Sequence, residues 1–339
     1  MAATIALATL MTGWPGTAAR ADVQIDGLAE TTPTTEATEA TQGFLLRGSA
    51  TWPTSDADYL RRSLPVLPTV AQLGLWHSPA VDFKRSDRVS GGRLEFSEFV
   101  AESPLWVRRL SDTALLSMRF NYEYTSLDTG VPGLGGALDL HRLELPLSVS
   151  WNPGGSPWRV FTRVSVTAKT DFDASWGDAV GYTALTGVFR RVSDSLSLGV
   201  GGYYAYSMGE HQFIPGAGFV WAPNDRFSAG LVGPWLTTSW RLSDDWRVRL
   251  EGRWRSSEWA VGDTALGGED TQVELRNVRA VAALERKLFE PFGSEAWLSL
   301  QAGYRFMTRL EVRDADRREL LREDVRDGMF FGVAIRVQL

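Results

Sequence analysis

The sequence predicts an all-β fold, a transmembrane antiparallel up-and-down β-barrel. Apolar and polar residues alternate in runs of roughly ten residues, the length of a tilted membrane strand. Tight turns alternate along the chain with longer polar loops, and tryptophans lie beside the tight turns. After the first dozen residues, no apolar stretch approaches the ~20 residues that a membrane helix needs. The pattern therefore favours strands, and not helices, as the membrane-spanning elements.

Composition excludes several kinds of chemistry. The 339 residues include no cysteine, so disulfides, thiolate metal sites and cysteine nucleophiles are impossible. A net charge of −6 argues against nucleic acid as a partner. Of the 35 basic residues only Lys84, Lys169 and Lys287 are lysine, and the other 32 are arginine.

The amino-terminal part predicts export. A short apolar run at 2–11 precedes Ala19-Arg20-Ala21, which has the small-x-small spacing of a signal peptidase site. We therefore expect a signal peptide at 1–21, with a disordered apolar tail as the alternative. A Thr/Glu-rich linker and lead-in at 22–67 follows, and the barrel takes up 68–339.

The carboxyl-terminal run carries the strongest local signal. Six apolar residues two apart end on the last residue: Met329, Phe331, Val333, Ile335, Val337 and Leu339. The run resembles the targeting strand that closes bacterial outer-membrane barrels, with leucine where that family usually ends in Phe or Trp. This resemblance implies recognition by the barrel-assembly machinery and location in the cell outer membrane.

The same period-two alternation recurs along the chain, at 114–124, 143–151, 158–169, 196–206, 246–254 and 298–306. Segments 180–192 and 272–286 change phase, so we expect bulges there.

The connections fall into two sets. Short turns rich in Ser, Asn and Asp lie at 109–112, 152–155, 191–194, 223–225 and 241–244, and longer loops lie at 126–138, 170–179, 260–270 and 311–327. Aromatic residues flank the short turns, as a membrane-interface girdle requires: Trp106, Trp151, Trp158, Trp221, Phe227, Trp240 and Trp246. A second girdle near the long loops would contain Tyr122, Tyr124, Tyr204, Tyr206 and Phe306.

The strand number then follows from the rim at which each turn lies, because consecutive antiparallel strands run in opposite directions. If the short turns share one rim, residues 227–242 must form a hairpin that bends at Gly233-Pro234, which gives fourteen strands beginning near 70–77. If Gly233-Pro234 is only a kink, twelve strands result. A soluble β-propeller is disfavoured, because the related turns at 109, 191 and 241 have no fixed period.

Several segments resemble an uncharacterised family of bacterial outer-membrane barrels, a domain of unknown function common in planctomycete-type bacteria. The similar segments are 246–254 (WRVRLEGRW), 276–279, 283–285 and 301–306 (QAGYRF), within a resemblance over about 90–339. It implies fold and location, and no catalytic residues.

Arginine dominates the face of the strands opposite the apolar one. We predict that this face lines a pore through Arg119, Arg142, Arg159, Arg163, Arg247, Arg249, Glu251, Arg253, Arg255 and Arg305, and we expect Arg309 and Arg336 inside as well. Because arginine rings favour anions in channels, the sequence predicts a porin-like passive channel that could select small anionic solutes. A lumen filled by hydrated Arg/Glu pairs is the alternative interpretation.

No catalytic, metal or cofactor site is predicted. His77, His141 and His211 are expected at the membrane interface or in the lumen, and the Gly-rich stretch 130–136 lacks the lysine of a phosphate-binding loop. The alternatives to a channel are a closed structural or lipid-interacting barrel and, third, an outer-membrane barrel enzyme. Expected partners are outer-membrane lipid and lipopolysaccharide, with no nucleic acid.

Overall fold

The computed structural model describes residues 69–84, 92–111, 113–131, 133–134, 136–154, 156–262, 264, 271–290 and 295–338. The predicted signal peptide (1–21) and lead-in (22–67) lie outside these residues. Among the described residues, no helix has the length and apolar character to cross a bilayer.

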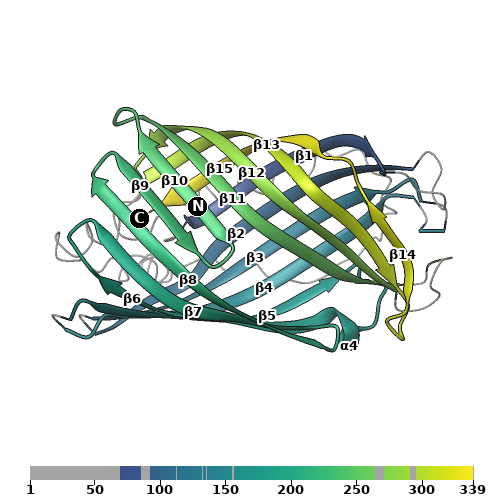
Figure 1. The fold of residues 1–339 in the computed structure, drawn as a ribbon, viewed down its shortest axis with the longest axis horizontal. Coiled ribbons are helices and arrows are strands. Elements are labelled where there is room, and N and C mark those ends of the chain that lie inside the picture. Colours follow the sequence, from purple (N-terminus) through teal and green to yellow (C-terminus); the bar gives the residue numbers. More distant parts are fainter. Residues whose placement is uncertain are drawn as a thin grey trace, which may run out of the picture. The chain divides into compact units, whose positions relative to one another are not determined.

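Fifteen strands and the short helix α4 (Trp176–Ala179) make up the described fold (Figure 1). The strands are β1 (Thr69–Asp82), β2 (Arg93–Ser111), β3 (Ala114–Asp128), β4 (Leu138–Trp151), β5 (Trp158–Thr170), β6 (Val180–Arg191), β7 (Leu196–Ser207), β8 (Glu210–Asn224), β9 (Phe227–Val232), β10 (Trp235–Arg241), β11 (Trp246–Val261), β12 (Thr271–Phe289), β13 (Glu295–Arg313), β14 (Glu319–Asp324) and β15 (Gly328–Gln338).

The sheet closes into an antiparallel barrel of fourteen strand positions. From β1 to β14 each strand pairs with the next in the chain, β15 pairs with β13, and β1 pairs with β15 to complete the ring. The strands β14 and β15 occupy one position, because both pair with the same side of β13. β14 pairs with the upper part of β13, which is the end towards the long loops, and β15 pairs with the lower part, towards the short turns. The predicted fourteen strands are confirmed and the twelve-strand alternative is wrong.

The predicted hairpin at Gly233-Pro234 decides this count. The strands β9 and β10 pair from Val232↔Trp235 to Phe227↔Trp240. Gly233 has a φ of +59°, a left-handed conformation that glycine adopts without strain. Gly233-Pro234 is therefore a tight turn between two strands and not a kink within one.

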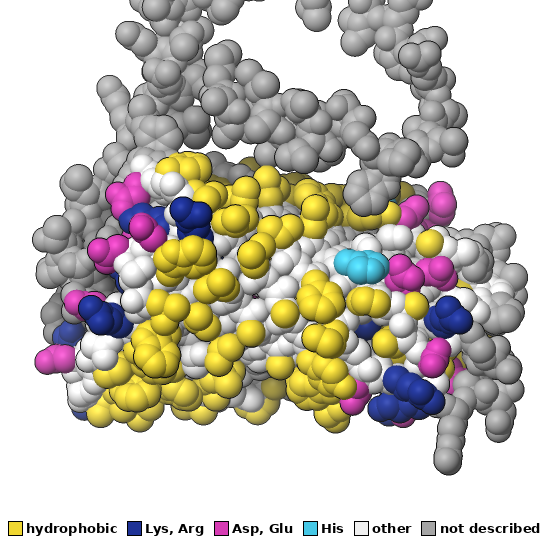
Figure 2. All heavy atoms as spheres, turned by 90° about the horizontal axis from the view of Figure 1, so that it is seen from above, with side chains coloured by type: hydrophobic (Ala, Val, Ile, Leu, Met, Phe, Trp, Pro, Cys, Tyr) yellow, Lys and Arg dark blue, Asp and Glu magenta, His cyan; other side chains and the backbone are white. Residues whose placement is uncertain are grey.

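The outer surface of the barrel is an apolar band with polar ends. Large apolar side chains are exposed all along the outward face of the strands, including Leu250, Phe213 and Ile335. Figure 2 shows the band on one face, with charged side chains concentrated beyond it at both ends. The tryptophans of the short-turn rim point outward and are exposed: Trp151, Trp158, Trp221, Trp240 and Trp246. Exposed apolar area on this scale is stable only against lipid, so the barrel spans a membrane.

Two local expectations about strand phase are corrected. The strand β6 pairs with β5 and β7 without a register shift, so the bulge expected within 180–192 is absent there. In β13, by contrast, the pairing with β12 shifts beside Arg276 and Met307 takes a φ of +55°. This bulge adds one residue to β13, so that above it the side chains that would have faced inward face outward. Arg309, expected inside, consequently lies outside and pairs with Asp324 at 2.9 Å.

Candidate functional site: the barrel interior

The ten predicted pore-lining residues all lie on the inward face of their strands. On β11 the outward Leu250 and Trp254 are 52% and 44% exposed. Arg247, on the inward face of the same strand, is buried. The remaining residues alternate with outward apolar ones in the same way: Arg119 on β3, Arg142 on β4, Arg159 and Arg163 on β5, Arg249, Glu251, Arg253 and Arg255 on β11, and Arg305 on β13. Whether they line a conducting path stays a prediction.

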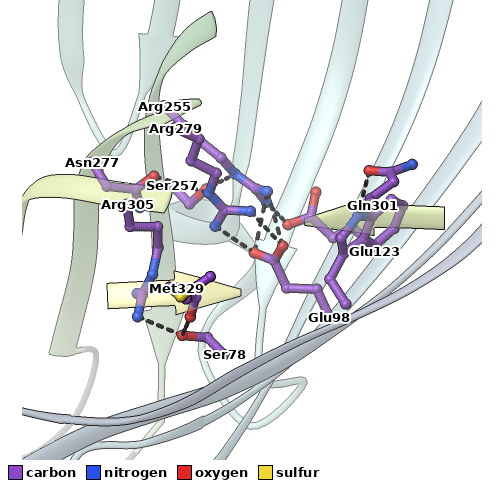
Figure 3. A network of polar contacts seen from close by, with 11 residues as sticks. Ser78, Glu98, Glu123, Arg255, Ser257, Asn277, Arg279, Gln301, Arg305 and Met329 are labelled. Carbon is purple, nitrogen blue, oxygen red and sulfur yellow. Dashed lines mark hydrogen bonds and ion pairs between the residues drawn. The ribbon is translucent and has the colours of Figure 1, made fainter. Parts of the chain in front are cut away.

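One carboxylate organises the upper part of the interior. Glu98 on β2 is 3% exposed and accepts hydrogen bonds from Nη1 and Nη2 of Arg279 at 2.7 and 2.9 Å (Figure 3). Arg255 pairs with Glu98 at 3.1 Å and also with Glu123 on β3. Arg305 donates to the Ser78 hydroxyl at 2.6 Å. Strands that are not neighbours in the barrel wall are thus joined by charged hydrogen bonds. Sequence reasoning missed Glu98 and Arg279.

A second carboxylate, Glu285 on β12, gathers arginines closer to the short-turn rim. It is fully buried, with Arg247 directly paired to it. Arg249 and Arg336 lie 3.1 and 3.6 Å from its Oε1. Arg249 is also paired with Glu251, so the cluster extends along β11.

Smaller clusters occupy the walls formed by β2 to β5. Glu144 on β4 accepts from Arg142 and Arg163, each at 3.0 Å. Arg119 pairs with Glu102 at 2.7 Å. These clusters resemble the hydrated Arg/Glu filling that was the alternative interpretation of the lumen, but the pairing is incomplete.

Arginines exceed carboxylates in this interior. Eight of them (Arg119, Arg142, Arg163, Arg247, Arg249, Arg255, Arg279 and Arg336) share six carboxylates (Glu98, Glu102, Glu123, Glu144, Glu251 and Glu285). Arg253 and Arg305 have no carboxylate within 4.0 Å among the described residues. Among the residues that the structure describes, the interior therefore carries a positive surplus.

Three of the arginines stand side by side. The register pairs Arg253 with Arg279, and Arg279 with Arg305, across β11, β12 and β13. Directly opposed like charges destabilise a sheet. Aromatic faces compensate for part of this, because the Arg305 guanidinium lies 4.1 Å from the ring centre of Phe96.

Towards the long-loop end, the interior changes from charged to apolar. A buried cluster, called here the mouth cluster, joins side chains from seven strands and three connections: Phe83, Leu94, Phe96, Leu127, Val131, Leu134, Leu140, Trp259, Val261, Val273, Leu275, Leu310, Val312, Leu321 and Val325. Leu134 and Val131 come from the 129–137 connection, so this loop contributes to the packing. The mouth cluster fills the barrel where an axial entrance would lie.

Space within the barrel is distributed unevenly. The inward side chains of β12, β13 and β15 are almost fully buried, among them Arg279, Arg305, Trp297 and Phe330. On the opposite wall the Arg142 and Arg163 side chains keep 31% and 30% of their surface exposed. Inward residues of β6 to β8, such as Leu185, Tyr203 and Ile214, are also partly exposed. The accessible part of the interior therefore lies against β4 to β8.

The histidines lie on the outward face. His141 is 3.0 Å from the Tyr122 hydroxyl, and His211 is 2.6 Å from that of Tyr204. Their tyrosines belong to the predicted second girdle. His77 is 3.1 Å from the Ser97 hydroxyl. Each histidine is therefore an outer-surface residue, on the opposite face of the strands from the charged clusters.

Comparison with known proteins finds likeness of fold. No family model matches the chain, and no curated protein matches it. A COG4313 outer membrane channel from Pseudomonas putida F1 is 10% identical with a TM-score of 0.45, over 80% of this chain and 96% of the other. The KdgM porin is 8% identical with a TM-score of 0.34, over 79% and 99%. A Pseudomonas aeruginosa FadL homologue is 10% identical with a TM-score of 0.38, over 79% and 90%.

The fold itself determines where such a chain resides. A closed antiparallel barrel with an outward apolar band, two aromatic girdles, short turns at one rim and long loops at the other is the architecture of outer-membrane proteins. The chain is an all-β, fourteen-stranded barrel of the cell outer membrane.

Proposed function

We propose that this barrel is a porin-like passive channel whose arginine-rich interior favours small anionic solutes. One observation carries the proposal: arginines outnumber the carboxylates that pair with them, and Arg253 has no carboxylate partner among the described residues. Arg253 is only partly buried, unlike Arg279 and Arg305 beside it. Its charge is therefore available to a solute in the accessible part of the interior.

The physical basis is the low dielectric of the surroundings. Lipid outside and a narrow interior leave little water to screen a fixed charge, so a positive surplus raises the local concentration of anions. Arg142 and Arg163 add to this effect, because both share the single carboxylate of Glu144 and remain about a third exposed.

Reversal potential in a KCl gradient across a planar bilayer tests the proposal. Wild type should select chloride, and Arg249→Glu combined with Arg253→Glu should shift selectivity toward potassium. Raised salt should weaken the preference by screening. The matched control is Arg190→Glu with Arg286→Glu, which makes the same charge change beside the outward Trp158 and Trp246. The control should retain the wild-type selectivity. Equal selectivity in all three proteins would contradict the proposal.

A second candidate is a closed structural or lipid-interacting barrel. The mouth cluster favours it, because fifteen buried apolar residues obstruct the axis at the long-loop end. Absence of any conductance in the refolded protein would support this function over the channel. For the third alternative, a barrel enzyme, the charged clusters and the outward histidines provide no supporting arrangement.

Several expectations about partners and family accompany this proposal. Contact with lipopolysaccharide, recognition of the last strand by the barrel-assembly machinery, and membership of the uncharacterised barrel family all remain predictions. The same holds for the expected lack of a cofactor or nucleic-acid partner.

A further inference from the structure

The wall between β8 and β11 is incomplete in its backbone pairing. The strands β9 and β10, which separate β8 from β11, are only 6 and 7 residues long. Among the described residues, β8 pairs with β9 no higher than Phe219, and β10 pairs with β11 no higher than Arg253. Above the Gly233-Pro234 turn, residues 211–217 of β8 therefore face 254–260 of β11 across a region that we call the seam.

Backbone direction shows which groups face the seam. Met208 and Gly209 form the β7–β8 turn with φ of +49° and +75°, a type I′ turn whose flanking residues Ser207 and Glu210 exchange hydrogen bonds. Because bonding direction alternates along a strand, the backbone groups of Phe213, Pro215 and their odd-numbered neighbours point away from β7, into the seam. Proline lacks an N–H and is confined to such unpaired strand positions.

Contacts close the seam at its two ends. At the lower end, the Trp254 N–H donates to the Pro234 carbonyl at 3.3 Å. At the upper end, Ala260 makes a bridge to Thr170 of β5 and packs with the buried Met208. Between these contacts, no backbone pairing joins β8 to β11 in the described residues.

Unpaired backbone at a membrane protein's edge requires water. Exposed N–H and C=O groups are not tolerated in hydrocarbon unless they line a water-filled space, because lipid offers them no hydrogen-bond partner. The side chains agree: Gln212 and Ser256 are exposed, and Phe213 is 69% exposed. The seam also lies level with the outer girdle, where His211 packs on Tyr204 and Tyr206. Water therefore reaches the seam from the long-loop side of the membrane.

Inside the seam lies the accessible part of the interior. The inward residue Ile214 of β8 and its partner Tyr203 on β7 are both partly exposed. Lys169 on β5 donates to Ser207 at 3.4 Å at the top of the same wall. Lys169 thus stands at the inner edge of the seam, beside the Glu258 carboxylate of β11, on the way to Arg142 and Arg163.

We propose that small anionic solutes enter the barrel sideways through the seam between β8 and β11, bypassing the mouth cluster. This inference rests on the proposed channel function, because it names the route by which that channel is reached. It explains together why the axis can be filled by apolar residues and why one stretch of wall lacks pairing.

The cysteine-free chain allows a direct test. Gln212→Cys and Ser256→Cys each place one thiol in the seam, and Gly177→Cys places a control thiol on α4, where an added Cβ meets nothing within 4 Å. Conductance of the refolded proteins is measured in planar bilayers before and after reaction with a polyethylene-glycol maleimide. Labelling either seam thiol should remove most of the conductance, and labelling Gly177→Cys should leave it unchanged. Two seam variants are used so that the misfolding of one leaves the other informative.

A second variant examines the axial route. Leu94→Ala with Leu127→Ala opens space in the mouth cluster, and conductance should not rise. A conducting protein that is unaffected by both seam labels, or whose conductance rises in the mouth-cluster variant, would overturn the side entrance and leave the channel function standing. An unlabelled protein that does not conduct would overturn both.

Discussion

Glu98 and Arg279 face one another across the barrel interior and are joined by two hydrogen bonds, at 2.7 and 2.9 Å. They are 181 residues apart in the chain, and β13, β15 and β1 lie between their strands around the ring. Planar guanidinium and carboxylate groups fit in this paired geometry, which makes such bonds strong and directional. The pair therefore holds two distant parts of the wall at a fixed separation.

Glu98→Gln should destabilise the barrel strongly. It removes the negative charge that Arg279 and Arg255 share, and a buried pair broken on one side typically costs about 3–5 kcal/mol. Urea unfolding in lipid vesicles, followed by tryptophan fluorescence, measures the loss. The control is Glu319→Gln, whose partner Arg322 is 48% exposed, for which we expect roughly 0–1 kcal/mol. Equal unfolding midpoints for the two variants would show that the Glu98 cluster does not contribute to stability.

Gly303→Ala should destabilise by overpacking. A Cβ at Gly303 would lie 2.2 Å from the ring of Phe330, which is buried against the interior. Forcing such a side chain aside costs about 1–3 kcal/mol. The variant should lose its folded, fast-migrating form on unboiled SDS gels at a lower temperature than wild type. Gly252→Ala is the matched control, because its Cβ would meet only the Leu236 Cβ at 3.8 Å. If both variants behave alike, the Phe330 contact is not the constraint.

Deletion of residues 331–339 should abolish assembly. This removes most of β15, whose residues pair with β1 from Phe331 to Gln338 and with β13 along the other edge. Two strand edges would then be open in lipid, which membrane barrels do not tolerate. Fractionation of cells expressing the deletion should find no protein in the outer membrane. A substitution of Met329 to Leu, which keeps the alternation, serves as the control. Normal outer-membrane levels of the deletion protein would refute the role of this strand.

The period-two pattern predicted the fold because one physical constraint acts on every membrane strand. A charged side chain is costly in lipid, so the residue pattern of each strand shows which of its side chains face outward. On β11, Leu250 and Trp254 must face outward and the arginines between them inward. The same constraint placed the exposed tryptophans at the short-turn rim. The number of strands followed from the requirement that the short turns share one rim, once Gly233-Pro234 was taken as a turn.

Other features depend on contacts that no local pattern contains. Glu98 lies on β2, where Pro104 coincides with a register shift and the alternation is irregular. Its partners Arg279 and Arg255 come from strands four and five positions away around the ring, which only closure brings near. The bulge at Met307 reverses strand phase within a regular-looking run, and Arg309 was misplaced for that reason. The mouth cluster likewise combines inward residues from several strands, and a single strand shows no sign of it.

The mouth cluster also implies an order of events in biogenesis. Burial of apolar side chains is favourable only when the alternative is water, and inside a bilayer that driving force between protein segments vanishes. Leu94, Leu310 and their neighbours can therefore gain stability from meeting only after their strand ends have crossed the membrane and reached the aqueous side. The barrel would first insert as a cylinder open at its far rim, and the rim would close afterwards, on the cell's exterior, by the ordinary collapse of a soluble protein core. Closure at the surface would also oppose withdrawal of the strands, because retreat would require this core to come apart in water.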